Sequence, residues 1–207
     1  MSFAHTLSIP ETVQSELKNG IRVATEDTGS PTATLGVWIE SGTRYETSEN
    51  NGISNFVEHL IFKGTDKRSQ TQLENDIERM GAVLNSYTDK EQTAFYVKCL
   101  ASDVPKAAQI LGDLIKNPKF DENEISKERE VILREMEEMD TNYQEVVFNH
   151  LHAIAFQQTP LAFSRVGTTE NVKKINRNDL VNYVNTNFKG PRIVLSAAGG
   201  VDHKQMY

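Results

Sequence analysis

Three residues of the stretch NNGISNFVEHLIFKGT have the types and spacing of a metal site: Asn55, Glu58 and His59. They differ by one residue from the pattern H-x-x-E-H, in which two histidines bind Zn²⁺ and the glutamate deprotonates a metal-bound water. On a helix, positions 55 and 59 are one turn apart and share a face. Here the first ligand position holds an amide, whose oxygen Zn²⁺ binds poorly compared with imidazole. The pattern therefore predicts a zinc-water site that has lost one ligand.

The third ligand of such a site is a carboxylate far along the chain, and Glu135 in ILREM is the candidate. Glu128 precedes it by two helical turns on the same face, where it would hydrogen-bond a ligand side chain and orient it without binding the metal itself. If no metal binds, Glu58 and Glu135 share a pocket without a cation, and at least one of these carboxyl groups should have a raised pKa. Replacing Glu135 by glutamine is then expected to be neutral or stabilising at neutral pH.

Hydrophobic patterning predicts the elements that would hold this site. The expected elements are a hairpin over 13–27 with a type I′ turn at Asn19-Gly20, a strand over 32–40, helices over 54–62 and 71–81, a hairpin over 82–100, helices over 104–117, 121–156 and 176–188, and a buried strand over 192–200. Asp121 and Asn178 are candidate N-caps, and Trp38 is expected to be largely buried in its strand. The order of elements indicates an α+β fold, with a mostly antiparallel sheet covered by helices on one side. We expect residues 1–12 to be an extension and 13–207 a single domain.

Composition narrows the range of partners. The formal net charge is -7 and no block of consecutive Lys or Arg occurs, which excludes nucleic acid and anionic lipid as primary partners. No apolar run is long enough to span a membrane. Cys99 is the only cysteine, so no disulfide can form within the chain, and its apolar surroundings predict a small buried side chain.

Several separate motifs, in this order, resemble the N-terminal half of the pitrilysin-type inverzincin family: NNGISNFVEHLIFKGT, LNSYT with EQTAFYVK, EREVILREM, LHAIAFQQTPLA and GPRIVLSAAGG. The resemblance implies metal-ligand positions at Asn55, His59 and Glu135 and a general base at Glu58. It also implies that the strand holding Asn85 and Tyr87 pairs with an extended peptide, although ordinary sheet packing accounts for these residues equally well. The resemblance also implies a second, similar half in full-length relatives, and we expect this chain to be a fragment without it.

Within the family the chain resembles the mitochondrial branch, which comprises processing-peptidase β-subunits and the first core proteins of ubiquinol:cytochrome c reductase. FVEHL, without the first histidine, is typical of core proteins, whereas ILREMEEM and KGPRIVLSAAGGV resemble the peptidase equally. The resemblance to core proteins implies a structural and assembly subunit on the matrix side of the inner membrane. Such a subunit would contact the second core protein and other reductase subunits, and its zinc binding would be weak or absent. The resemblance to the processing peptidase implies a zinc endopeptidase that removes presequence peptides together with an α-subunit. A stand-alone peptide-binding module is a third alternative.

Overall fold

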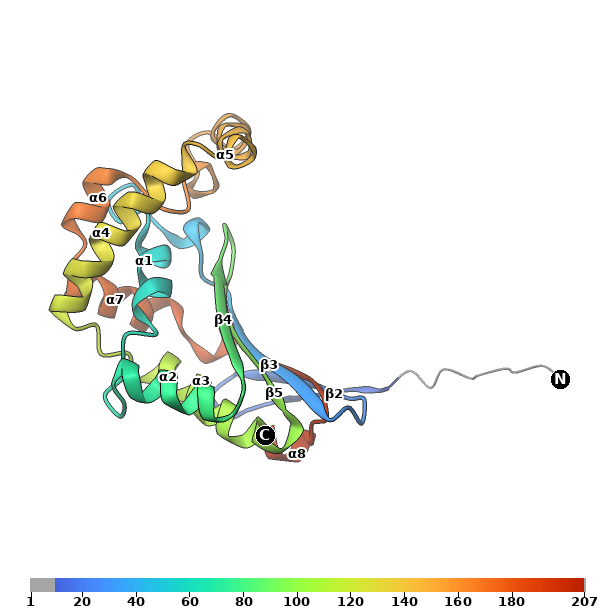
Figure 1. Ribbon diagram of the computed structural model, residues 1–207. Coiled ribbons are helices and arrows are strands. Elements are labelled where there is room, and N and C mark those ends of the chain that lie inside the picture. The colour runs from blue at the N-terminus through green and yellow to red at the C-terminus, as the bar shows by residue number, and fades with distance from the viewer. Residues whose placement is uncertain (1–9, 207) are drawn as a thin grey trace.

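The computed structural model describes residues 10–206, so residues 1–9 of the expected N-terminal extension lie outside the described residues. In this part of the chain, six strands form one open sheet in the order β1-β2-β6-β3-β5-β4 (Figure 1). The strands are β1 (Thr12–Glu16), β2 (Arg22–Asp27), β3 (Thr32–Ile39), β4 (Val83–Thr88), β5 (Thr93–Leu100) and β6 (Ile193–Gly199). The α-helices are α1 (Ile53–Leu60), α2 (Gln70–Arg79), α3 (Val104–Lys116), α4 (Glu122–Met139), α5 (Tyr143–Ala155), α6 (Thr169–Lys174), α7 (Arg177–Asn187) and α8 (His203–Met206). Short 3₁₀ turns are η1 (Thr43–Tyr45), η2 (Ala101–Asp103), η3 (Pro160–Ala162) and η4 (Gly190–Arg192).

The predicted fold class is confirmed. All strand pairs are antiparallel except β2 with β6, which run parallel, so the sheet is mostly antiparallel. Both expected hairpins form, as β1–β2 and β4–β5, and β4 is one edge of the sheet. The first hairpin does not have a type I′ turn, because Gly20 has a positive φ but Asn19 does not. Within residues 10–206, no helix combines the length and hydrophobicity needed to cross a membrane.

The expected helix over 121–156 is instead two helices, α4 and α5, and α5 stands away from the sheet in Figure 1. The break follows from Asn142, whose side chain accepts a hydrogen bond from the amide of Glu145 and caps a new helix. Asp121 caps α4 as predicted. Asn178 is not the cap of α7, because Asn176 accepts from the amides of Asn178 and Asp179. Sequence alone could not choose between these neighbouring asparagines.

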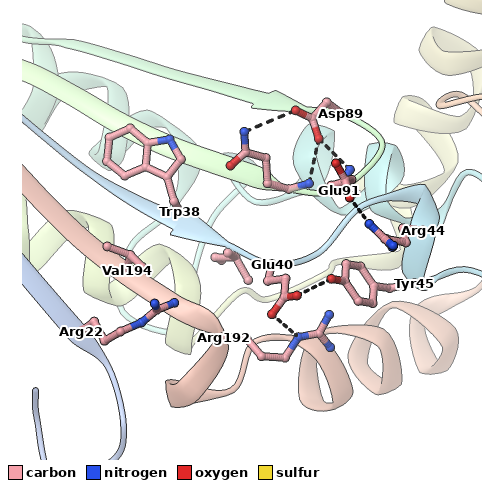
Figure 2. Close-up of a pocket in the computed structure, with 11 residues that line it drawn as sticks. Arg22, Trp38, Glu40, Arg44, Tyr45, Asp89, Glu91, Arg192 and Val194 are labelled. Atoms are coloured by element: carbon pink, nitrogen blue, oxygen red, sulfur yellow. Dashed lines mark hydrogen bonds and ion pairs between the residues drawn. The ribbon is translucent and has the colours of Figure 1, made fainter. Parts of the chain in front are cut away.

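Trp38 is mostly buried, as predicted, but it lies outside the hydrophobic core. Val37 and Ile39 are buried in the hydrophobic core, and side chains alternate along a strand, so Trp38 lies on the opposite face of β3. There its indole N–H donates to the Tyr87 hydroxyl at 3.2 Å. It lines a hollow of about 710 Å³ whose walls carry Arg22 and Arg192 (Figure 2). Cys99 is buried at the core, as predicted.

Candidate functional site

The site lies where α1 packs against α4, and the start of α1 is fixed by a buried carboxylate. Glu46 is 3% exposed and accepts hydrogen bonds from the amide of Gly52 at 2.9 Å and the amide and hydroxyl of Ser54 at 2.8 and 2.6 Å. Burial raises the pKa of Glu46, and these hydrogen bonds oppose that rise. By satisfying free N–H groups at the helix N-terminus, Glu46 sets the orientation of α1 and of the site residues that follow on it.

His59 lies between two carboxylates of α4. Its Nε2 is 3.2 Å from Glu135 Oε2, and its Nδ1 is 3.3 Å from Glu128 Oε2. The other oxygen of Glu128 contacts Lys63 Nζ at 2.8 Å. Burial lowers the pKa of His59, but the two carboxylates outweigh burial and raise it above its usual range. A neutral imidazole has one N–H, so only the imidazolium donates to both glutamates.

Asn55 is completely buried and contacts the same α4 carboxylate as His59. Its amide Nδ2 donates to Glu135 Oε2 at 3.2 Å, while its Oδ1 accepts a hydrogen bond from the guanidinium of Arg165. Arg165 also contacts Glu135 Oε1 through Nη2 at 2.9 Å. The structure thus brings together the three residues assigned as metal-ligand positions. It also places a cation, the guanidinium of Arg165, between Asn55 and Glu135.

The expected raised pKa is wrong for Glu135. Burial raises the pKa of this carboxyl, but the hydrogen bond with His59 and the charge of Arg165 outweigh burial and hold the pKa at about 2. The expectation assumed a pocket without a cation, and Arg165 supplies one. No sequence motif marks Arg165. The only available signal was a lone arginine in the otherwise uncharged stretch LAFSRVG.

Glu58 points toward the sheet. Its Oε1 accepts a hydrogen bond from the Ser86 hydroxyl of β4 at 2.9 Å, and its Oε2 is buried without a hydrogen-bond partner among residues 10–206. Ser86 is therefore the side chain of the edge strand that faces the site. Because side chains alternate, Asn85 and Tyr87 lie on the other face of β4, where Tyr87 meets Trp38. A peptide-binding role for this strand remains a prediction that rests on its free edge.

As they stand, these side chains do not fit a zinc ion. Zinc needs lone pairs, but both ring nitrogens of His59 face carboxylate oxygens, and the amide oxygen of Asn55 accepts a hydrogen bond from a guanidinium. Glu135 in turn accepts hydrogen bonds from Asn55 and Arg165, so all three ligand positions are already engaged by other groups of the protein. In the described part of the chain, no group of three or more His, Cys, Asp or Glu side chains is arranged to hold a metal.

The chain matches one family model and is similar to several known proteins. The family model described as "Insulinase (Peptidase family M16)" matches residues 22–169. The chain is 56% identical over 200 residues to the mitochondrial-processing peptidase subunit beta of Bos taurus, covering 97% of this chain and 41% of that protein. It is 52% identical over 206 residues to cytochrome b-c1 complex subunit 1 of Homo sapiens, covering 99% and 43%. A solved protease from Helicobacter pylori has the same fold, with a TM-score of 0.89 at 19% identity over 96% of this chain and 48% of that one.

Proposed function

Because the chain belongs to the insulinase (M16) peptidase family, we propose that it is part of a core subunit of the mitochondrial ubiquinol:cytochrome c reductase. In this proposal the peptidase-type site joins helices α1 and α4 and does not hydrolyse peptides. The subunit would lie on the matrix side of the inner membrane and contact the second core protein and other reductase subunits. The chain spans about two fifths of the length of its curated relatives, so this proposal concerns the whole protein.

One observation carries the proposal: the position of the first ligand is an amide that accepts a hydrogen bond from an internal guanidinium. A zinc peptidase needs a metal-bound water that a glutamate can deprotonate. Glu58 is in place for that step, but the residues that would hold the metal are engaged with one another and with Arg165. Loss of an imidazole that binds the metal directly should lower metal affinity or activity by at least the 10- to 100-fold typical for loss of a residue that only hydrogen-bonds a ligand.

Two observations favour the alternative, a processing-peptidase β-subunit. The identity to the peptidase subunit is 56%, slightly above the 52% to the reductase subunit. Glu58 also keeps one buried carboxylate oxygen without a partner among the described residues, as a base that receives a proton from water would. These observations do not restore the missing ligand, and we rank this function second.

The test is peptide cleavage by the full-length protein. We expect no cleavage of a basic amphipathic presequence peptide with added Zn²⁺, either alone or with a processing-peptidase α-subunit. The Glu58→Gln variant should give the same background rate. In parallel, the protein should co-purify with the second core protein from mitochondria solubilised in mild detergent. Cleavage that Glu58→Gln abolishes would refute the proposal and establish the peptidase function.

A further inference from the structure

Arg165 reaches the site from a loop whose backbone is fixed immediately before it. The ammonium group of Lys90, in the β4–β5 turn, donates to the carbonyl oxygen of Phe163. The side-chain Nδ2 of Asn51 donates to the carbonyl oxygen of Ser164 at 2.9 Å. These two donors come from separate parts of the chain. The loop therefore enters the site in one defined position.

The backbone after Arg165 is fixed by close packing. Val166 is 1% exposed. Gly167 has a φ of +82° and lies so near the preceding segment that a Cβ added there would be 2.3 Å from the carbonyl oxygen of Asn51. A Cβ on Gly52, just before α1, would be 2.7 Å from the carbonyl oxygen of Val166. Two glycines thus allow the loop to lie directly against the start of α1.

The guanidinium uses its two amino groups on two different helices. Nη1 donates to Asn55 on α1, and Nη2 donates to Glu135 on α4 at 2.9 Å. A planar guanidinium presents its N–H donors in a rigid fork, which an ammonium group cannot reproduce. Arg165 therefore links its loop to two helices, and only 29% of its side chain is exposed.

We infer that Arg165 is the resident cation of this site and that it excludes zinc. Its guanidinium binds Asn55 and Glu135, the residues at two of the three ligand positions that the family resemblance assigns, and neutralises the carboxylate that a metal would otherwise neutralise. A metal can reach these groups only after the guanidinium leaves. Restoring histidine at position 55 is therefore insufficient for zinc binding while Arg165 remains. This inference rests on the proposed function in one respect, the absence of bound zinc.

Four full-length proteins test the inference: wild type, Asn55→His, Arg165→Ala and the double variant. Each is dialysed against micromolar Zn²⁺ with a weak chelator, and zinc per chain is measured by mass spectrometry. We expect stoichiometric zinc in the double variant alone, with an affinity at least about tenfold higher than that of Asn55→His. Arg134→Ala in the Asn55→His background is the matched control, because Arg134 is an exposed arginine of the same helix as Glu135, and it should not increase zinc binding.

The outcomes separate the two proposals. Equal zinc affinity in Asn55→His and in the double variant would overturn the role of Arg165 and leave the proposed function intact. Stoichiometric zinc in the wild type would overturn both. Presequence cleavage by the wild type without stoichiometric zinc would overturn the proposed function alone.

A double-mutant cycle keeps the inference falsifiable if histidine at position 55 prevents folding. Arg165→Ala and Glu135→Gln should each lower the folding equilibrium constant about tenfold or more, and together by much less than the product of the two effects. Arg134→Ala should change it little. Independent, multiplicative effects of Arg165→Ala and Glu135→Gln would show that the two side chains do not interact, and would overturn the inference.

Discussion

Glutamine in place of Glu135 is expected to destabilise the protein by about 2 kcal/mol at pH 7. The pKa of Glu135 is held at about 2, against a usual value of 4.5. Since one pKa unit corresponds to about 1.4 kcal/mol, this difference sets an upper bound of about 3.5 kcal/mol, which partial exposure of the carboxylate reduces. The variant leaves Arg165 without its anionic partner. This result is opposite to the one expected for two carboxylates that share a pocket without a cation.

The contribution of Glu135 to folding stability depends on pH in a defined direction. A carboxyl group with a depressed pKa stabilises the folded state above the unfolded value of 4.5, and this contribution is lost as the pH falls from 4.5 toward 2. The stability difference between wild type and Glu135→Gln, measured by urea unfolding, should therefore shrink over that interval. Glu138→Gln on the exposed side of α4 is the control and should change stability by less than about 0.5 kcal/mol. A variant at position 135 that is more stable than wild type at pH 7 would contradict this account.

Alanine at Gly167 is expected to destabilise the protein by about 3 kcal/mol or more. The φ of +82° alone disfavours any residue with a Cβ, and that Cβ would lie 2.3 Å from the carbonyl oxygen of Asn51. The loop must then move away from the start of α1, and Arg165 moves with it. Thermal unfolding followed by circular dichroism measures the effect.

Gly29→Ala separates the two causes. Gly29 has a similar φ of +66°, but a Cβ there would meet no atom within 4 Å. This variant should therefore lose only the conformational contribution of about 1 kcal/mol. If Gly167→Ala and Gly29→Ala are equally destabilising, the close approach of the loop to α1 contributes nothing to stability, and the fixed position of Arg165 loses its basis.

Local patterns predicted the part of the site that lies on regular elements. The spacing between Asn55 and His59 placed both on one face of α1, and the helical pattern around Glu135 also placed Glu128 toward the site. The structure brings all four residues together. The family resemblance, read from several ordered motifs, is confirmed by the match over residues 22–169. The roles of these residues as ligands, base or support stay predictions.

The position of Arg165 depends on long-range contacts that no local sequence pattern reveals. Arg165 lies 110 residues from Asn55 along the chain, in a loop without periodicity. The loop is directed into the site by hydrogen bonds from Lys90 and Asn51 and by the close packing of two glycines. Trp38 is a different case, because strict alternation with Val37 and Ile39 already placed it on the opposite face. The run around Trp38 predicts a central strand, and Trp38 lies on the face of the sheet that helices do not cover (Figure 1).

The most direct measurement of the central claim is X-ray diffraction at the zinc absorption edge, from crystals of the protein grown with Zn²⁺. We expect electron density for the Arg165 guanidinium between Asn55 and Glu135, and no anomalous peak at that position. An anomalous peak within bonding distance of His59 and Glu135, with Arg165 turned away from both, would contradict it.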